Sequence, residues 1–351
     1  MPFSLDIVVP VWNRPLETRS CLVDLSKYAP DARIIMVDNG SDQETERLLE
    51  EFAEILGERA MFLRSGYNHG FVKALNRGLS MASAPLLAVV RSSSRVTEGW
   101  LTPMTTLVAR RRDVGVVVPR LLKFDGAVPR NVRAELSPPV EISHGSFAAM
   151  LFRKELYDAI GGFDEEFDSG YYALKDYSRR AYRAGYLTFA AEGAPVFFEE
   201  EQQLGSLARR EELTRRSRHT FRQQWGEEQQ FCIYLPKRMP VSQVRERMGM
   251  VVRAARIGHE LTVLAHPSIY KTLVKEGGEH LHRKVHLSRL PRFFSDGAVK
   301  QQVNRLRVKD RTCRMVPASD TIRFPGMEGI MTFAEFERLI VTTERDFYCR
   351  S

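Results

Sequence analysis

The chain has 351 residues, of which 43% are hydrophobic and 27% charged, which is typical of a folded globular protein and argues against wholesale disorder. At roughly 100–200 residues per domain, this length predicts two domains. Apolar runs such as Pro85–Val90 are far too short to cross a bilayer, which needs about 20 apolar residues. The N-terminal stretch has no basic segment and meets a charge at Asp6, so we do not expect a signal peptide.

The cysteine spacing and the charge distribution bear on the cellular compartment of the protein and on the kind of partner it binds. Cys21, Cys232, Cys313 and Cys349 show neither a CxxC pair nor zinc-type spacing, which fits a reducing cytosol and predicts no structural metal. The net charge is +8, but residues 229–351 hold 22 Lys and Arg against 12 Asp and Glu, a net +10, and the rest of the chain is at −2. A basic domain can bind nucleic acid, anionic lipid or an anionic glycan. No nucleic-acid-binding motif is visible, whereas contact with the inner face of a membrane stays open.

Short apolar strands alternate with amphipathic helices along the first hundred residues. We expect strands at 5–11, 33–37, 60–63 and 86–90, with helices at 16–28, 43–56 and 70–81. This alternation predicts a parallel α/β sheet covered on both faces. The first two strands end in polar loops that contain Asn or Asp with Pro or Gly, and ligands of open α/β sheets bind beyond such strand ends.

A second α/β pattern begins near residue 230, after a stretch at 199–224 that reads as a surface helix or a linker. Between the two patterns we expect strands at 114–118 and 147–152, a helix at 177–184, and short apolar runs at 187–190 and 196–198. The second pattern predicts strands at 231–235, 260–265, 285–287 and 314–316, with helices at 241–257, 268–275, 298–308 and 332–342. The predicted fold is α/β, with a large unit at 1–228 and a smaller, basic, Rossmann-like unit at 229–351. The smaller unit lacks G-x-G-x-x-G after its first strand, so a dinucleotide site there is not indicated.

An ordered series of motifs runs through the large unit. It comprises Val8-Val9-Pro10-Val11-Trp12-Asn13-Arg14, Val37-Asp38-Asn39-Gly40-Ser41-Asp42, Asn68-x-Gly70-Phe71-x-x-Ala74-x-Asn76-x-Gly78, Val96-Thr97-x-Gly99-Trp100-Leu101, His144-Gly145-Ser146-Phe147, Gly161-Gly162-Phe163-Asp164-Glu165-Glu166-Phe167 and Asp176-x-Ser178-x-Arg180-x-x-x-Ala184-Gly185-Tyr186. Over about residues 4–200 this series resembles the family 2 glycosyltransferases of the GT-A fold. Those enzymes move a sugar from a nucleoside diphosphate to an acceptor with inversion. The order and spacing of the motifs carry the resemblance, since no single motif is specific.

The resemblance and the chemistry of these residues agree on a nucleotide site. Trp12 can stack on a base, and Asp38 can accept hydrogen bonds from a base N–H or a ribose hydroxyl. Gly40 lets the backbone approach closely, and Ser41 with Asp42 can cap the next helix. The alternative that Asp38 to Ser41 simply form a turn before the next helix stays open. The residues expected to bind the nucleotide sugar are Pro10, Trp12, Asn13, Arg14, Asp38, Asn39, Asn68, Gly70, Lys73, Asn76, Arg91, Ser93 and Arg95.

The chain departs from the family at its catalytic positions. The resemblance implies an acidic DxD-type motif for Mn²⁺ or Mg²⁺ after the fourth strand, where this chain has Arg91-Ser92-Ser93-Ser94-Arg95 and Ser93 takes the Asp position. A serine hydroxyl carries no charge and cannot by itself hold a hard divalent cation. The family's Glu-Asp pair, which includes the catalytic base, falls on Ala173-Leu174, and no histidine stands near Val196 to complete a metal site.

Two hypotheses follow from these departures. In the first, the chain is a glycosyltransferase that neutralises the leaving diphosphate with Arg91 and Arg95 instead of a metal, and Asp176 or a carboxylate within residues 199–201 serves as the base. In the second, it is an inactive binding or scaffold protein that keeps the nucleotide pocket. The expected partners are a nucleoside-diphosphate sugar and a glycan or lipid-linked acceptor; a divalent cation stays open, although its acidic ligands are missing.

Overall fold

The computed structural model describes residues 3–123, 137–167, 170–199, 207–237, 239–292, 295–309, 312–319 and 330–349. The chain divides into two compact units. The first comprises residues 1–139 and 144–221, and the second comprises 140–143 and 222–351. The division thus falls inside helix α7 (Leu207–Trp225). This helix occupies much of the charged stretch for which the sequence predicts either a surface helix or a linker.

The first unit is built on a mixed sheet in which the strands are ordered β3-β2-β1-β4-β7-β5-β8. Four parallel strands form one half: β1 (Leu5–Val11), β2 (Arg33–Asn39), β3 (Ala60–Ser65) and β4 (Leu86–Val90). The other half contains β5 (Val114–Lys123), β7 (Ala149–Arg153) and β8 (Leu187–Phe198). Strand β7 runs antiparallel to β4, with Ala149 opposite Val90, so the segment before β7 lies where β4 ends.

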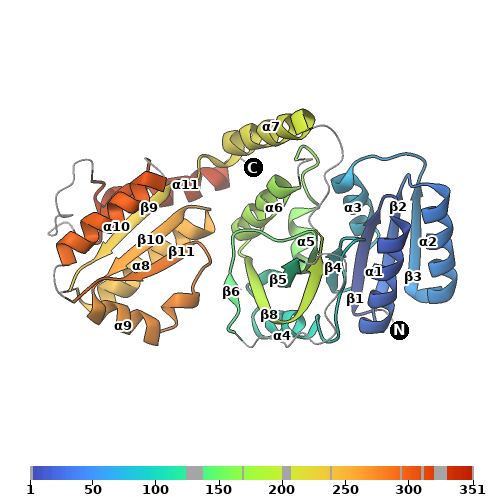
Figure 1. The fold of residues 1–351 in the computed structure, drawn as a ribbon, viewed down its shortest axis with the longest axis horizontal. Helices are drawn as coiled ribbons and strands as arrows, with labels where there is room; N and C mark the ends of the chain where they lie inside the picture. The colour runs from blue at the N-terminus through green and yellow to red at the C-terminus, as the bar shows by residue number, and fades with distance from the viewer. Residues whose placement is uncertain are drawn as a thin grey trace. The chain divides into compact units, whose positions relative to one another are not determined.

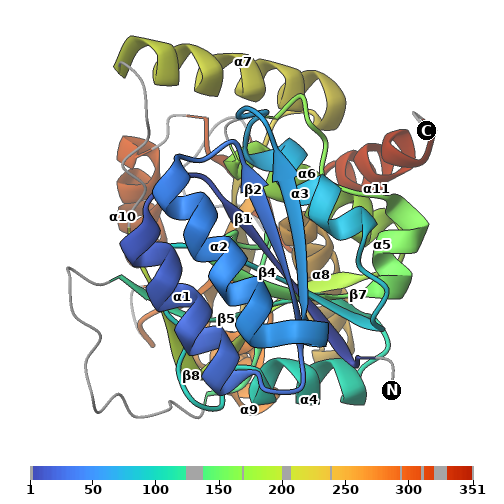
Figure 2. The same ribbon diagram turned by 90° about the vertical axis from the view of Figure 1, so that its right-hand side faces the viewer.

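Side-chain alternation along the strands divides the first core into two layers. Leu5, Ile7, Val9 and Val11 of β1 pack with α1 (Pro15–Tyr28) and α2 (Gln43–Leu56), which lie side by side in Figure 2. Successive side chains of a strand point to opposite faces, so Val8 faces the other layer, where it meets α3 (Phe71–Ser80). The remaining helices of this unit are α4 (Thr102–Arg110), α5 (Lys154–Ile160) and α6 (Tyr171–Arg183) (Figure 1).

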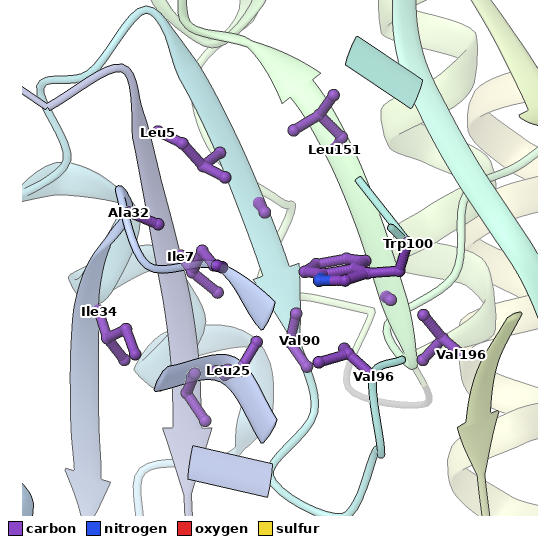
Figure 3. Close-up of a cluster of buried hydrophobic side chains, with 14 of the residues drawn as sticks. Leu5, Ile7, Leu25, Ala32, Ile34, Val90, Val96, Trp100, Leu151 and Val196 are labelled. Atoms are coloured by element: carbon purple, nitrogen blue, oxygen red, sulfur yellow. The ribbon is translucent and has the colours of Figure 1, made fainter. Parts of the chain in front are cut away.

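Trp100 occupies the centre of the larger core layer. Its indole is fully buried and lies among Val90, Val96, Leu151 and Val196 (Figure 3). Trp100 and Val96 belong to one of the motifs that carry the family resemblance. Val96 and Trp100 of this motif therefore pack the core.

The second unit contains a parallel sheet with the order β11-β10-β9-β12. Its strands are β9 (Gln230–Leu235), β10 (Glu260–Ala265), β11 (Val285–Arg289) and β12 (Arg314–Pro317). Its helices are α8 (Val241–Arg256), α9 (Pro267–Lys275), α10 (Ser295–Lys309) and α11 (Phe333–Cys349), and β6 (Val140–Glu141) is grouped with it. Short 3₁₀ turns at Gly57–Arg59 and Gly278–His280 complete the elements. Within the described ranges, no helix combines the length and the apolar character needed to span a membrane.

Gly78 gives a direct test of how closely α3 packs on the sheet. A Cβ atom at this position would lie 2.4 Å from Cγ1 of Val8 and 2.8 Å from Cγ2 of Val37. We expect Gly78→Ala to lower the free energy of unfolding by about 1–3 kcal/mol, because overpacking forces neighbouring side chains out of place. Urea unfolding measures the change. Gly249→Ala in α8 is the control, since nothing lies within 4 Å of its Cβ position and alanine favours a helix. Equal stability of the Gly78→Ala variant and the wild type would contradict the packing described.

Candidate active site

The ends of β1 and β2 bring together the first two predicted nucleotide-binding residues. Asp38 is 1% exposed, and its Oδ1 accepts the backbone N–H of Ser41 at 2.9 Å. Among the described residues, no donor reaches its other carboxylate oxygen, Oδ2. Trp12 follows β1 and is 37% exposed. A buried acceptor beside an open aromatic ring can receive a planar ligand that carries N–H or O–H donors.

The loops after β1 and β2 hold each other in place. The backbone N–H of Asn13 donates to Oγ of Ser41 at 2.9 Å, and Oδ1 of Asn13 accepts from the N–H of Asp42 at 2.8 Å. Asp42 caps α2 by accepting the N–H of Thr45 at 2.9 Å, and this hydrogen bond lowers the pKa of the Asp42 carboxyl. Asn13 therefore acts as a clasp that joins the loop after β1 to the loop after β2 by hydrogen bonds. Asp42 caps the helix as the sequence predicts.

Asn39 fixes the loop after β3 against the end of β2. Its Nδ2 donates to Oδ1 of Asn68 at 2.9 Å and to the carbonyl of Gly70 at 3.2 Å, and its Oδ1 accepts the N–H of His69 at 3.0 Å. Gly40 makes this approach possible, because a Cβ there would lie 2.4 Å from the carbonyl carbon of Tyr67. Asn39, Asn68 and Gly70, which were predicted to contact the nucleotide, thus shape the loop on that side of the site.

Asn76 binds a protein loop. Its Nδ2 donates to the carbonyl of Phe163 at 2.8 Å, and its Oδ1 accepts the N–H of Phe163 at 2.9 Å. The predicted contact of Asn76 with the nucleotide sugar is not supported, since this amide holds the loop around Gly162 onto α3. Lys73 lies exposed in the first turn of α3, and Pro10 is buried within β1.

The end of β4 carries Arg91 and the serines that replace the acidic motif. The backbone N–H of Arg91 donates to the carbonyl of Ala148 at 3.3 Å, and its guanidinium carbon lies 5.8 Å from the centre of the Phe71 ring. Oγ of Ser94 donates to the same carbonyl of Ala148 at 2.8 Å, and Ser93 is buried. Arg91 thus lies where β4, α3 and the segment before β7 meet.

Two residues assigned to the site by the sequence lie elsewhere. Arg95 forms a two-point ion pair with Asp24 of α1, with Nε 2.5 Å from Oδ2, and the hydrogen bond to Asp24 raises the pKa of Arg95. Asp176 is fully buried in α6, where its Oδ2 accepts from Nε of Arg180 at 2.7 Å. Arg180 in turn donates to the carbonyls of Ile160 and Gly162. These ion pairs argue against phosphate neutralisation by Arg95 and against proton transfer by Asp176.

An ion pair that the sequence did not predict joins the end of β1 to the end of β8. Nη2 of Arg14 lies 3.0 Å from Oε2 of Glu199, and Nε of Arg14 donates to Oε1 of Glu17 at 3.0 Å. Burial opposes the charge of Arg14, but the hydrogen bonds that Arg14 donates to Glu199 and Glu17, with the attraction of both carboxylates, outweigh it and raise the pKa of Arg14. Glu199 was one of the candidate bases; the other two, Glu200 and Glu201, lie outside the described residues. No local sequence signal could have found a pair separated by 185 positions.

A divalent cation does not fit the side chains at the end of β4. Within the described ranges, no three His, Cys, Asp or Glu side chains converge as metal ligands. Ser93 and Ser94 offer neutral hydroxyls, and that of Ser94 already donates to a backbone carbonyl. Hard cations such as Mg²⁺ and Mn²⁺ require carboxylate ligands. The donor set therefore matches an anion held by guanidinium groups better than a metal ion.

Comparison with known proteins places the first unit in context. Residues 6–169 match the family described as Glycosyl transferase family 2. The chain is 23% identical over 170 residues to polypeptide N-acetylgalactosaminyltransferase 5 of Caenorhabditis elegans, a match that covers 48% of this chain and 24% of the relative. It is 24% identical over 165 residues to the PGL/p-HBAD biosynthesis glycosyltransferase of Mycobacterium bovis, with coverage of 45% and 62%. The chain thus spans less than two thirds of each relative.

Solved structures agree on the fold. GalNAc-T7 with UDP, GalNAc and Mn²⁺ superposes with a TM-score of 0.52 at 15% identity, covering 64% of this chain and 48% of the other. The mannosyltransferase PcManGT from Pyrobaculum calidifontis, in complex with GDP-Man and Mn²⁺, gives 0.50 at 12% identity, covering 99% and 88%. Identities this low bear on the fold alone. The N-terminal part of the chain thus resembles the family 2 glycosyltransferases, as its motifs predict, and it has their GT-A fold.

Proposed function

We propose that the chain is a glycosyltransferase that uses a nucleoside-diphosphate sugar as donor. The observation that carries this proposal is the buried carboxylate of Asp38, whose Oδ2 has no partner among the described residues, beside the half-exposed ring of Trp12. Ligands of open α/β sheets bind beyond the carboxyl ends of the strands, where both residues lie. The match to family 2 over residues 6–169 and the nucleotides bound in the structural neighbours support the same ligand class.

The order of the strands suggests how the donor lies. The nucleoside binds at the ends of β1 and β2, and the diphosphate extends toward the end of β4, where Arg91 meets it. An acceptor hydroxyl then attacks the anomeric carbon in line, the bond from that carbon to the diphosphate oxygen breaks, and the hydroxyl proton passes to solvent water. Negative charge grows on the leaving diphosphate, and a fixed guanidinium is suited to stabilise it.

A second candidate function is a binding protein without turnover. Ala173 and Leu174 occupy the positions of the family's acidic pair, and Asp176 is fully buried against Arg180. None of these can take a proton from an acceptor hydroxyl. These three residues are consistent with a protein that binds the nucleotide sugar and does not transfer the sugar.

Acceptor and location belong to the same proposal. The net charge of +10 over residues 229–351 favours an anionic partner, such as a lipid-linked or anionic glycan acceptor at the inner face of a membrane. Electrostatic attraction of this kind weakens as salt is added. We therefore expect the chain to bind vesicles with anionic lipids at low salt and not neutral vesicles, and co-sedimentation measures this.

A thermal-shift screen of nucleoside diphosphates and their sugars tests the proposed function. A ligand that binds only the folded state raises its stability, by about 2.7 kcal/mol at a concentration of 100 Kd. We expect at least one nucleoside diphosphate to do so in EDTA, and we expect Asp38→Ala to lose most of the shift. Asp31→Ala, at an exposed aspartate, is the control. Product formation from the stabilising sugar nucleotide then distinguishes a transferase from a binding protein. No shift with any nucleoside diphosphate, with or without Mn²⁺, would reject both functions.

A further inference from the structure

We infer that the ion pair of Arg14 and Glu199 takes the place of the divalent cation in this site, with Arg14 binding the donor diphosphate and Glu199 positioning its guanidinium. This inference rests on the proposed function and deepens it. It assigns a role to an ion pair that the sequence motifs do not predict.

The first argument is where the ion pair lies. Arg14 follows β1, which is hydrogen-bonded to β2 on one side and β4 on the other. Glu199 follows β8, and the preceding Phe197 exchanges two backbone hydrogen bonds with Arg95, at 2.8 and 2.9 Å. The end of β8 is thereby brought beside the serines after β4. The pair with Glu199 therefore holds the guanidinium of Arg14 at the end of β8, which is the strand end that pairs with the segment after β4.

The second argument is the backbone at the end of β1. Asn13 and Arg14 have φ of +55° and +60°, and among the described residues they are the non-glycine residues with positive φ. A left-handed conformation costs a bulky residue such as arginine of order 1 kcal/mol or more, and such strain concentrates at functional sites. The clasp of Asn13 with Ser41 and Asp42 enforces this turn. The strained turn is coupled to the site, because the same clasp shapes the loop that follows Asp38.

The third argument is the chemistry of the pair. The Arg14 and Glu199 side chains are 44% and 31% exposed, so an incoming anion can reach the guanidinium. A surface ion pair of this kind contributes little to stability, at most about 1 kcal/mol. A guanidinium has five N–H donors, so Arg14 can keep its contacts to Glu17 and Glu199 and still donate to phosphate oxygens. Oriented in this way, it presents charge-assisted N–H donors to the oxygens of the leaving diphosphate.

The decisive measurement compares the affinity for a nucleoside diphosphate with that for the same nucleoside without phosphates. The probes are UDP against uridine and GDP against guanosine, measured by calorimetry in EDTA. We expect Arg14→Ala to weaken diphosphate binding about 10–100-fold, the usual effect of losing a charge-assisted hydrogen bond, and to leave nucleoside binding unchanged. Millimolar methylguanidinium should restore part of the loss. Arg19→Ala is the matched control, since Arg19 lies on α1 in an exposed pair with Glu51.

Glu199→Gln separates positioning from simple attraction. Removing this negative charge should leave diphosphate affinity equal or higher, while kcat for donor turnover falls about tenfold because the guanidinium is less well oriented. A merely structural ion pair predicts similar small losses of thermal stability in both variants, with the diphosphate-to-nucleoside ratio unchanged, and that result would overturn the inference. If the wild type binds no nucleoside diphosphate, the proposed function itself fails. If the wild type binds a nucleoside diphosphate and Arg14→Ala leaves the ratio of diphosphate to nucleoside affinity unchanged, only this inference fails.

Discussion

Replacing Arg91 by alanine is expected to reduce donor turnover about 10²–10³-fold and to weaken diphosphate binding, because a preorganised cation is lost from the leaving group. The guanidinium carbon of Arg91 lies 5.8 Å from the centre of the Phe71 ring of α3, and this contact helps to orient it. The test compares the turnover of wild type and Arg91→Ala with the sugar nucleotide found in the screen, first in EDTA and then with Mn²⁺. Arg91→Lys should recover part of the rate, since a lysine restores the charge without the planar pair of donors.

Arg95→Ala is the matched control for this prediction. Arg95 lies four residues further along the same loop, but its guanidinium is engaged by Asp24. We expect its removal to lower thermal stability and to leave diphosphate affinity unchanged. Equal losses of turnover in the two variants would show that the loop, and not the Arg91 charge, matters. A rate that requires added Mn²⁺ would overturn our interpretation of the serine segment.

The largest effect on stability is expected from Asp6, at the start of β1. Asp6 is fully buried and accepts four hydrogen bonds at 2.7 to 2.9 Å: two from Arg33 and one each from the backbone N–H groups of Ser83 and Ala84. Removing one partner of a buried ion pair leaves the other charge uncompensated, which costs about 3–5 kcal/mol. We expect Asp6→Asn to lower the free energy of unfolding by about this amount, as measured by urea titration at pH 7. Asp113→Asn, in an exposed pair with Arg111, should change it by less than about 1 kcal/mol.

The pH dependence of this effect has a definite sign. Burial alone would raise the pKa of Asp6, but the hydrogen bonds from Arg33, Ala84 and Ser83 outweigh it, and the pKa lies below its ordinary value of 3.8. The stabilisation from Asp6 is therefore complete above pH 3.8 and is lost as the pH falls through the lower pKa of the folded state. The difference between wild type and Asp6→Asn should be constant above about pH 5 and shrink in acid. A difference that grows in acid would contradict this assignment.

The repeating pattern of the sequence determined most of the elements. Strand β1 and helix α2 have the predicted bounds, because their apolar spacing is regular and a turn or a cap closes each of them. The pattern missed α4 and α5 and began α6 six residues late, at Tyr177 instead of Tyr171. It also divided β8 in two, since Glu192 and Gly193 interrupt the apolar alternation where the pairing with β5 shifts register.

For the candidate site, local sequence was sufficient where a residue acts beside its own strand end. Trp12 follows β1 and Asp38 lies near the end of β2, which pairs with β1, so the two predicted residues lie at the same edge of the sheet. It was insufficient for Arg95, Asn76 and Asp176, because the direction of a side chain depends on which distant element offers a partner. Asp24, Phe163 and Arg180 supplied those partners.

By itself, then, the sequence determined the α/β fold and the family resemblance, both of which are written in residue type and spacing, and it predicts that the acidic motif is lost. Only the tertiary structure decided which charged groups meet at the strand ends of the sheet. Arg14 and Glu199 are brought together because β8 joins the sheet beside β5 and its end returns to pair with the loop after β4. Such a contact depends on the order of strands in space, which periodicity along the chain does not encode.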